Sequence, residues 1–495
     1  MWHVRSIVRD RNPNIDAVIE TIESLGEALR ARLAAGVDPG RDRALYQAVA
    51  VYLLYNRVEP DLSALIQDDQ AVAVRGWPRF EGEVRRFLEL PALGPPAFDP
   101  AELLAFFFQV CRAFQFTIDH ILGGSLAVAR LRASVWQSIF THDIDCYRRA
   151  LTQRLHDITT LIVGPSGTGK ELVARAIASS RYIPFDPKEQ RFTEDFRGAY
   201  HALHLAALSP TLIESELFGH RKGAFTGAVS DRIGWLEQCP PLGTVFLDEI
   251  AETDPAIQVK LLHVLETRAF QRVGDAKERR FQGKVIAATN RDLAAEMQAG
   301  RFRADLYYRL CADVIETPSL EAQLRDAPEE LGHFLRVIAR RVAGEAEADA
   351  LAQEVEAWIT KHLGFDYRWP GNVHELEQCV RNVLIRGEYR PPRRAVAGLR
   401  DELAGAFLAG ALTADELLRR YCTLGFAQTG NYVETARRLG IDRRTVKEKV
   451  DLALLEHLRP EASAARSTRI PRASTAARSS RGCSTTSPTP PSPPS

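Results

Sequence analysis

The chain has 495 residues, of which 45% are hydrophobic and 26% are charged, and this size is sufficient for more than one folded domain. Its 64 basic and 64 acidic residues cancel, so no overall electrostatic field draws the protein to nucleic acid or to an anionic membrane. The absence of a signal-peptide core and of an uninterrupted apolar window of roughly 20 residues, together with seven scattered cysteines, predicts a soluble cytoplasmic protein without membrane contact.

The first predicted elements are helices. Apolar residues recur at alternating steps of four and three over residues 15–33, and further helices are expected over 44–57 and 100–116. The phenylalanines of the third helix are expected to pack in a core. The stripe of the first helix predicts packing within the domain, and a seam with a second copy of the chain is the alternative. Residues 1–117 are therefore interpreted as an α-helical regulatory domain.

Short β-branched runs follow beyond residue 120. The runs 159–163 and 244–247 each end in a glycine-rich or acidic motif and continue into a helical stretch. This alternation predicts a parallel sheet with helices, so residues 118–317 are expected to form an α/β nucleotide-binding core. Residues 318–395 show a helical pattern without strand-like alternation, which predicts a separate small helical domain.

A last helical unit is expected over residues 401–458. Residues 459–495 are rich in Ser, Thr, Pro, Ala and Arg and contain almost no large apolar side chain. Such a segment cannot bury enough surface to offset its chain entropy, so it is predicted to be a disordered tail. Its arginines are expected to be solvated, and nonspecific contact with DNA phosphates is the alternative.

A glycine-rich turn lies between the run 159–163 and the next helical stretch, which is the context that a phosphate-binding loop needs. Glycines let backbone N–H groups curl around phosphates, the helix N-terminus adds positive partial charge, and Lys170 supplies a full charge. Glu171 stands where the general pattern has Ser or Thr for magnesium. The predicted loop consists of Gly164, Pro165, Ser166, Gly167, Thr168, Gly169, Lys170 and Glu171.

A second motif places two carboxylates at the end of an apolar strand. The run 244–247 is followed directly by Asp248 and Glu249, as in a Walker B motif. Asp248 is predicted to hold Mg²⁺ through water, and Glu249 is predicted to polarise the water that attacks the nucleotide. Together with the upstream loop, this pair predicts a site for ATP and Mg²⁺, whereas a strand end with solvated acids is the structural alternative.

Three motifs make the chain similar to a known family. The loop has the form GxSGTGKE, residues 214–220 read ESELFGH, and residues 223–228 read GAFTGA. In this order they resemble the AAA+ ATPase core of sigma-54-dependent transcriptional activators, the bacterial enhancer-binding proteins, in which a glutamate after the lysine is usual. The resemblance implies that the GAFTGA loop contacts sigma-54. That loop consists of Gly223, Ala224, Phe225, Thr226, Gly227 and Ala228.

The resemblance also implies further site residues. Asn290 follows a strand that is similar to the sensor I strand, and residues 302–310 are similar to a segment whose two arginines, here Arg303 and Arg309, reach the site of the neighbouring subunit. The turn at 369–373 resembles the start of the sensor II helix of the lid, which makes residues 318–395 an AAA+ helical lid. His374 stands at the sensor position of that helix.

Two histidines depart from the family pattern. His374 replaces an arginine, and a neutral, shorter imidazole is expected to weaken the signal from nucleotide to lid. His204 aligns with the asparagine that holds the catalytic glutamate between turnovers, so the restraint on Glu249 is expected to be altered. The stretch 125–160 is also longer than expected, and residues 1–117 lack the acidic cluster and lysine of a phosphoacceptor receiver domain.

Residues 430–447 resemble the Fis-type helix-turn-helix of the same family. Gly440 permits the turn, Ala436 is small where the helices cross, and Asp442 is expected to cap the second helix. A helical hairpin with a solvated basic face is the structural alternative. The residues predicted to face DNA are Arg443, Arg444, Thr445 and Lys447.

The resemblance implies an ATPase ring, expected to be a homo-hexamer, bound to upstream double-stranded DNA. It would use ATP hydrolysis to remodel the closed complex of sigma-54 RNA polymerase into an open complex. The alternative is a DNA-bound regulator that binds nucleotide with weak or no ATPase activity, which His204 and His374 motivate. A AAA+ remodeller of another client is a third reading, against which the GAFTGA sequence argues.

Overall fold

The computed structural model describes residues 15–37, 40–68, 73–74, 76–95, 98–152, 154–198, 200–364, 367–391, 410, 412–451 and 455. The chain divides into two compact units, Met1–Arg390 and Pro391–Ser495. The predicted tail at 459–495 lies outside the described residues.

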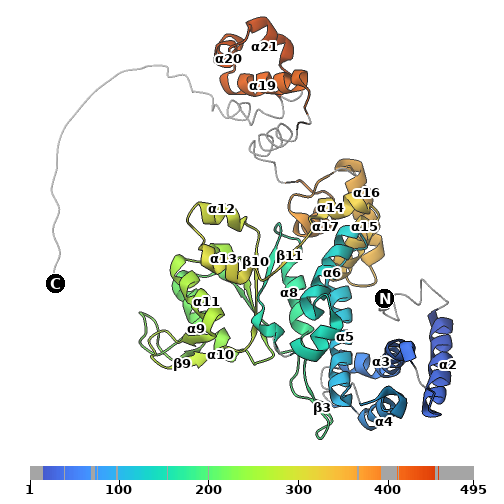
Figure 1. The fold of residues 1–495 in the computed structure, drawn as a ribbon. Coiled ribbons are helices and arrows are strands. Elements are labelled where there is room, and N and C mark those ends of the chain that lie inside the picture. Colours follow the sequence, from blue (N-terminus) through green and yellow to red (C-terminus); the bar gives the residue numbers. More distant parts are fainter. Residues whose placement is uncertain are drawn as a thin grey trace, which may run out of the picture. The chain divides into compact units, whose positions relative to one another are not determined.

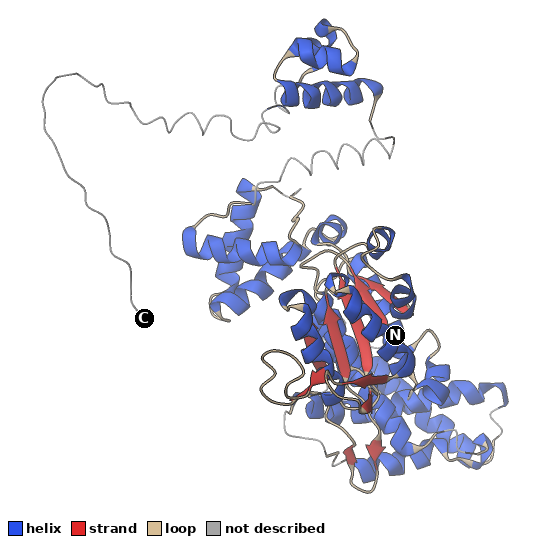
Figure 2. Cartoon of the chain, turned by 90° about the vertical axis from the view of Figure 1, so that its left-hand side faces the viewer, coloured by secondary structure: helices blue, strands red, loops and turns tan. Residues whose placement is uncertain are grey.

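Unit one contains a five-stranded parallel sheet in the order β11-β1-β10-β7-β4 (Figures 1 and 2). This order confirms the prediction of a parallel α/β core with flanking helices. The five strands are β1 (Thr160–Val163), β4 (Tyr200–His204), β7 (Thr244–Asp248), β10 (Lys284–Thr289) and β11 (Asp313–Glu316). Three two-stranded hairpins are β2 (Phe185–Asp186) with β3 (Arg191–Phe192), β5 (Gly219–His220) with β6 (Arg232–Ile233), and β8 (Ala269–Gln271) with β9 (Glu278–Arg280).

The helices of unit one fall into three stretches of the chain. Those before the sheet are α2 (Ile15–Ala34), α3 (Arg43–Gln67), α4 (Trp77–Leu88), α5 (Pro100–His120), α6 (Leu126–Phe140) and α7 (Ile144–Cys146), followed by a π-helical turn, Tyr147–Leu151. Those between strands are α8 (Lys170–Ser179), α9 (Pro210–Phe218), α10 (Trp235–Gln238), α11 (Pro255–Thr267), α12 (Leu293–Gln298) and α13 (Ala304–Leu310). Those after the sheet are α14 (Leu320–Asp326), α15 (Glu330–Ala343), α16 (Ala348–His362) and α17 (Asn372–Arg386).

Alternation along each buried strand separates two cores. Side chains of even number, such as Ile162 and Ile286, join a core with α5, α6 and α8, while Leu161 and Val285 join a second core with α9, α11 and α13. A sheet covered on both faces needs strands that are apolar throughout, which the β-branched runs provide. The helices α14 to α17 enclose a third core of their own.

The first core also includes the helices before residue 117. It extends from Leu33 in α2 to Ile315 in β11, and it contains Phe106, Phe107 and Phe108 of α5. The predicted packing of these phenylalanines is confirmed. The sequence-based boundary at 117/118 falls inside α5, which continues to His120. The division into a regulatory domain and a nucleotide-binding core remains a proposal.

Helix α5 is long and apolar, although polar residues such as Gln109 and Arg112 interrupt its sequence. Within the described part of the chain, it is the single helix that is long and apolar enough to cross a membrane. However, 67% of its apolar window is buried inside the protein, as in a core helix. The packing of α5 against α8 and α3 accounts for its apolar composition.

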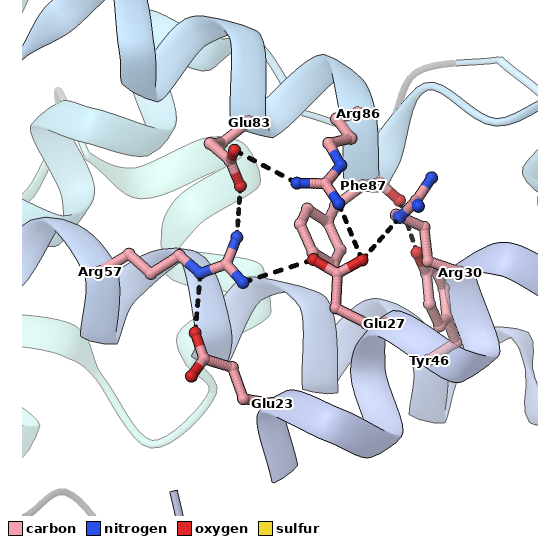
Figure 3. Close-up of polar contacts among 8 residues, drawn as sticks. All are labelled: Glu23, Glu27, Arg30, Tyr46, Arg57, Glu83, Arg86 and Phe87. Atoms are coloured by element: carbon pink, nitrogen blue, oxygen red, sulfur yellow. Dashed lines mark hydrogen bonds and ion pairs between the residues drawn. The ribbon is translucent and has the colours of Figure 1, made fainter. Parts of the chain in front are cut away.

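Charged side chains connect helix α2 to α3 and α4 (Figure 3). Arg57 of α3 pairs with Glu23 at 3.0 Å and Glu27 at 3.4 Å on α2, and also with Glu83 on α4. Arg86 of α4 reaches Glu27 at 2.9 Å. We call the network of Glu23, Glu27, Arg30, Arg57, Glu83 and Arg86 the ionic cluster.

Unit two contains three described helices of the predicted helix-turn-helix: α19 (Ala414–Thr429), α20 (Tyr432–Leu439) and α21 (Arg443–Lys449). Its small core contains Ala436 and Val446. Gly440 ends α20 in a left-handed conformation with φ of 67°, which confirms its predicted role in the turn.

Candidate functional site

A cavity of about 340 Å³ lies at the carboxyl end of the parallel strands, between the glycine-rich loop and the lid helices. Residues 166–173, Asp248 and Glu249 line it together with His374 and His204. The structure therefore brings together the two sequence-predicted motifs. Parallel α/β sheets bind ligands at this end of their strands because the loops and helix N-termini gather there.

The glycine-rich loop runs directly from β1 into α8. Gly167 and Gly169 have φ of 77° and 85°, conformations that side chains with a Cβ rarely adopt. Lys170 opens α8, and its Nζ donates to the carbonyl oxygens of Gly164 at 3.1 Å and Pro165 at 3.2 Å. Burial lowers the pKa of Lys170, while the charges of Glu249 and Asp248 oppose that shift.

The two carboxylates stand at the end of β7. Glu249 has a left-handed backbone with φ of 55°, an uncommon conformation for a residue with a side chain and one that occurs at functional sites. Its Oε2 accepts the backbone N–H of Asn290 at 3.2 Å. Asp248 Oδ1 accepts the N–H of Glu249 at 3.0 Å. The backbone of Asn290, which follows β10, therefore lies beside Glu249, while Asn290 is not among the residues that line the cavity.

His204 lies beside the acidic pair at the end of β7. It was expected to alter the restraint on Glu249, and its Nδ1 lies 2.9 Å from Oδ2 of Asp248. The register of β4 and β7 explains this contact, since His204 is the strand partner of Asp248. The imidazole thus competes for the carboxylate that was predicted to hold the metal, rather than for the one that was predicted to polarise water.

The lid contacts the glycine-rich loop directly. Asn372 Nδ2 donates to the carbonyl of Ser166 at 2.8 Å, and the N–H of Val373 donates to the carbonyl of Gly167 at 3.1 Å. His374 follows on the same helix and lines the cavity. The sequence indicated the turn before α17, but it did not identify Asn372 as the residue that joins lid to loop.

An apolar wall completes the cavity. The sequence analysis missed these residues because they come from α6, the segment before it, and the lid, and no motif marks them. Two charged lid residues, Arg341 and Glu377, also line the cavity and were missed for the same reason. The apolar wall consists of Ile121, Leu122, Val128, Leu131, Phe334, Val337 and Ile338.

The two predicted arginines lie apart from this cavity. Arg303 is exposed and pairs with Asp305 at 2.6 Å, just before α13. Arg309 donates to the carbonyl of Leu265 at 3.0 and 2.7 Å. Neither belongs to the residues that line the nucleotide cavity of their own chain.

The GAFTGA loop joins the strands of the β5–β6 hairpin. The N–H of Gly223 donates to the carbonyl of Ala228 at 2.8 Å, which closes the loop, and Thr226 at its tip is exposed. Phe225 packs edge-on against the ring of His220, with ring centroids 5.0 Å apart. An ion pair between Arg221 and Asp231 at 2.5 Å closes the base.

The loop is tied to the neighbouring β8–β9 hairpin. The N–H of Val273 donates to Gly219 at 2.9 Å, and the N–H of Arg221 donates to Val273 at 3.0 Å. Arg272 forms a bidentate pair with Glu237 of α10, with both distances at 2.7 Å. The GAFTGA loop is therefore mounted on a base stabilised by paired charges, while its tip has few contacts.

In unit two, Asp442 caps α21 by accepting the N–H of Arg444 at 2.7 Å, as predicted. Val446 is buried, so the opposite side of α21 faces solvent. The side chains of Arg443, Arg444 and Lys447 are exposed, and Thr445 is half-buried. An exposed basic face on the second helix of such a unit has the form of a major-groove reader.

Comparison with solved structures gives a weak overall likeness. NtrX from Brucella abortus in complex with ATP aligns with a TM-score of 0.40 and 23% sequence identity, over 76% of this chain and 79% of that chain. At that score the likeness carries no argument about ligand or mechanism.

Comparison with known sequences is more specific. The chain is 42% identical over 300 residues to the transcriptional regulatory protein ZraR of Escherichia coli K12, and it spans 63% of that relative's length and 59% of its own. It is 43% identical over 241 residues to the Nif-specific regulatory protein of Azotobacter vinelandii, over 49% of this chain and 42% of that protein. Residues 142–316 match the model of the sigma-54 interaction domain. Residues 142–316 are thus similar to the sigma-54 interaction domain, as the motifs of the nucleotide-binding core indicate, and the chain spans less than two thirds of the length of these relatives.

Proposed function

We propose that this protein hydrolyses ATP and uses the free energy to remodel sigma-54 RNA polymerase from the closed to the open promoter complex. The observation that supports the proposal best is the convergence of Lys170, Asp248 and Glu249 on one cavity below the lid. A buried lysine and two carboxylates at a helix N-terminus are the parts that phosphoryl transfer from a nucleotide needs.

Each residue has a role that follows from its position. Lys170 and the N–H groups of the loop bind the phosphates, and Glu249 orients the attacking water with Asn290 beside it. The apolar wall from α6, the segment before it and the lid accommodates the base. Asp248 is the carboxylate that would hold Mg²⁺ through water, and the bound ion would neutralise charge on the phosphates.

Arg303 and Arg309 support assembly of a ring. Both lie outside the cavity of their own chain, on or next to α13. A guanidinium that completes the site of an adjacent subunit makes hydrolysis depend on oligomerisation. We propose a homo-oligomer, a hexamer, in which these arginines leave Asp305 and Leu265 to reach the neighbour's phosphates.

The sigma-54 contact is assigned to the tip of the GAFTGA loop. Thr226 is exposed and Phe225 rests on His220, so both can reach a partner when the loop rises. The paired charges at its base transmit movement of the core to the tip. Upstream double-stranded DNA is assigned to the basic face of α21, through Arg443, Arg444 and Lys447.

A Glu249→Gln variant tests the motor. We expect turnover of ATP with Mg²⁺ to fall about 100-fold, because the amide cannot accept a proton from water, while nucleotide binding is retained. Glu266→Gln, an exposed glutamate on α11, is the matched control and should retain full activity. A wild-type rate no higher than that of Glu249→Gln would favour the alternative, a DNA-bound regulator with weak or no ATPase activity, for which His204 on Asp248 is the supporting contact.

A Thr226→Ala variant tests the client. We expect ATPase activity to remain while open-complex formation with sigma-54 RNA polymerase falls at least about tenfold, because the tip loses its hydroxyl contact. Ser230→Ala, an exposed loop hydroxyl outside the motif, should open promoters like the wild type. Equal promoter opening by all three proteins would contradict the assignment of the sigma-54 contact to Thr226, and no opening by the wild type would show that the remodelled partner is another protein.

A further inference from the structure

A second cavity of about 340 Å³ lies at the amino-terminal end of the parallel strands, opposite to the end that holds the nucleotide site. Lys284, the first residue of β10, lies on its wall, whereas the nucleotide cavity adjoins the strand ends. Helix α8 connects the two, since its first residue Lys170 lines the nucleotide cavity and Ile177 near its last turn lines the second cavity. The sequence motifs did not indicate this cavity.

A buried lysine and a half-buried arginine line the cavity. Lys284 is 4% exposed, and its Nζ donates to the carbonyl of Ile158 at 2.7 Å. Arg181 follows α8 and donates to the carbonyl of Gly243. Within the described ranges of the chain, neither cation has a carboxylate within 4.0 Å. Burial of Lys284 without a carboxylate partner, beside the second cation Arg181, costs free energy that an anion in the cavity would offset.

The pKa shifts of Lys284 and Arg181 agree with the lack of a paired negative charge. Burial lowers the pKa of Lys284 to about 8, against the opposing charge of Asp313. Burial lowers the pKa of Arg181 to about 10, against Glu194 and the Cys239 thiol. An anion between the two cations would restore both to their ordinary range.

The remaining wall combines hydrogen-bonded polar groups with apolar side chains. Tyr147 donates to Oε1 of Gln109 at 2.8 Å, and Gln109 donates from Nε2 to the carbonyl of Ser180 at 3.0 Å, so these buried polar groups have partners within the wall. The apolar lining residues are Ile139, Leu155, Ile177, Pro184, Pro241 and Leu242.

We propose that this cavity binds a small organic carboxylate, with the carboxylate between Lys284 and Arg181 and an apolar body against the opposite wall. A volume of this size accommodates about ten non-hydrogen atoms, given about 30 Å³ for each water-sized group. The occupant is therefore a monocarboxylate of low mass. This site is separate from the ATP site and does not depend on the proposed hydrolysis.

Isothermal titration of the full chain with benzoate and with benzamide tests the proposal. The two probes have the same shape and differ in charge, so we expect benzamide to bind at least about tenfold more weakly. Inorganic phosphate, which is an anion without an apolar body, is also expected to bind more weakly. Benzoate binding should persist in Lys170→Ala, which separates this cavity from the phosphate loop.

Variants locate the binding. Lys284→Met should weaken benzoate at least about tenfold, while Lys284→Arg keeps the charge and should stay within about threefold. Lys260→Met, on the exposed surface of α11, is the matched control and should bind benzoate like the wild type. Leu242→Trp fills the cavity and keeps both cations, so it decides the question if Lys284→Met does not fold.

Four outcomes would overturn the proposal: no benzoate binding, equal binding of benzoate and benzamide, phosphate binding as tight as benzoate, or unchanged binding in folded Leu242→Trp. None of them bears on ATP binding at Lys170. Loss of ATP hydrolysis with retained benzoate binding would, conversely, count against the proposed function alone.

Discussion

At the scale of single residues, Gly167 of the phosphate-binding loop leaves no space for a side chain on the side of the lid. A Cβ on Gly167 would lie 2.6 Å from the carbonyl oxygen of Gly371, at a backbone φ of 77°. Gly167→Ala should therefore displace the lid from the loop and lower ATP affinity at least about tenfold, measured by titration with a non-hydrolysable nucleotide. Gly82→Ala, in open space on α4, is the matched control and should be neutral or stabilising. Unchanged affinity in Gly167→Ala would mean that the loop and lid do not meet in the binding state.

The same residues show what the sequence could predict. Lys170, Asp248 and Glu249 are recognisable because phosphate chemistry requires fixed spacing within one strand, turn and helix. The replacement of an asparagine by His204 was expected to alter the restraint on Glu249, but the contact of His204 with Asp248 could not be predicted, because strand register decides the partner and a single motif does not reveal the register. The apolar wall of the cavity comes from separate elements that only the tertiary fold unites, so no local pattern marked it.

At the scale of elements, the ionic cluster controls the attachment of α2. Replacing Arg57 by Met removes its contacts with Glu23, Glu27 and Glu83 on two helices at once. Partly exposed pairs are each worth well under 1 kcal/mol after solvent screening, so the three together should lower protection of α2 amides about tenfold in hydrogen exchange. Arg85→Met, which removes one exposed pair with Glu81, is the matched control and should leave α2 protected. Equal protection in both variants would show that apolar contacts alone retain α2.

Acid should release α2 as well. Burial alone would raise the pKa of Glu27, but hydrogen bonds from Arg30 and Arg57 and the charge of Arg86 outweigh it, so the pKa is lowered from 4.5. A lowered carboxyl pKa contributes stability that is present above the unfolded value and is lost as pH falls through the folded value. Protection of α2 should therefore be full at neutral pH and decline below about pH 4.5, and added salt should reduce it.

Element boundaries followed burial more than local propensity. The helix predicted over 44–57 continues as α3 to Gln67, through Pro60. A proline inside a helix removes one hydrogen bond and costs about 3 kcal/mol, which favours ending the helix there. Buried Leu62, Leu65 and Ile66 in the following turns offset that cost. This stabilisation by burial is evident only from the tertiary structure, so the helix end predicted from the sequence alone came too early.

At the scale of the whole molecule, the division after Arg390 separates two activities. A chain ending at Arg390 should keep nucleotide binding and ATPase activity, since every residue of the cavity lies before that point. It should lose sequence-specific DNA binding, measured by titration of upstream DNA at fixed salt. Lys447→Ala in the full chain is the companion variant: it should weaken DNA binding and leave ATPase activity unchanged. DNA binding by the shortened chain would place the DNA contact in unit one.

The core that α5 shares with the sheet governs what can be removed from the front of the chain. The side chains of Phe107 and Leu104 pack in the same interior as Ile162 and Ile286 of the strands. Deleting residues 1–117 would therefore expose the apolar side chains on one face of the sheet. The shortened protein is expected to be poorly soluble and not to gain ATPase activity. Any signal received by these early helices must therefore change the packing of the shared core. The helices form part of that core, so they cannot move away from the sheet as a rigid body.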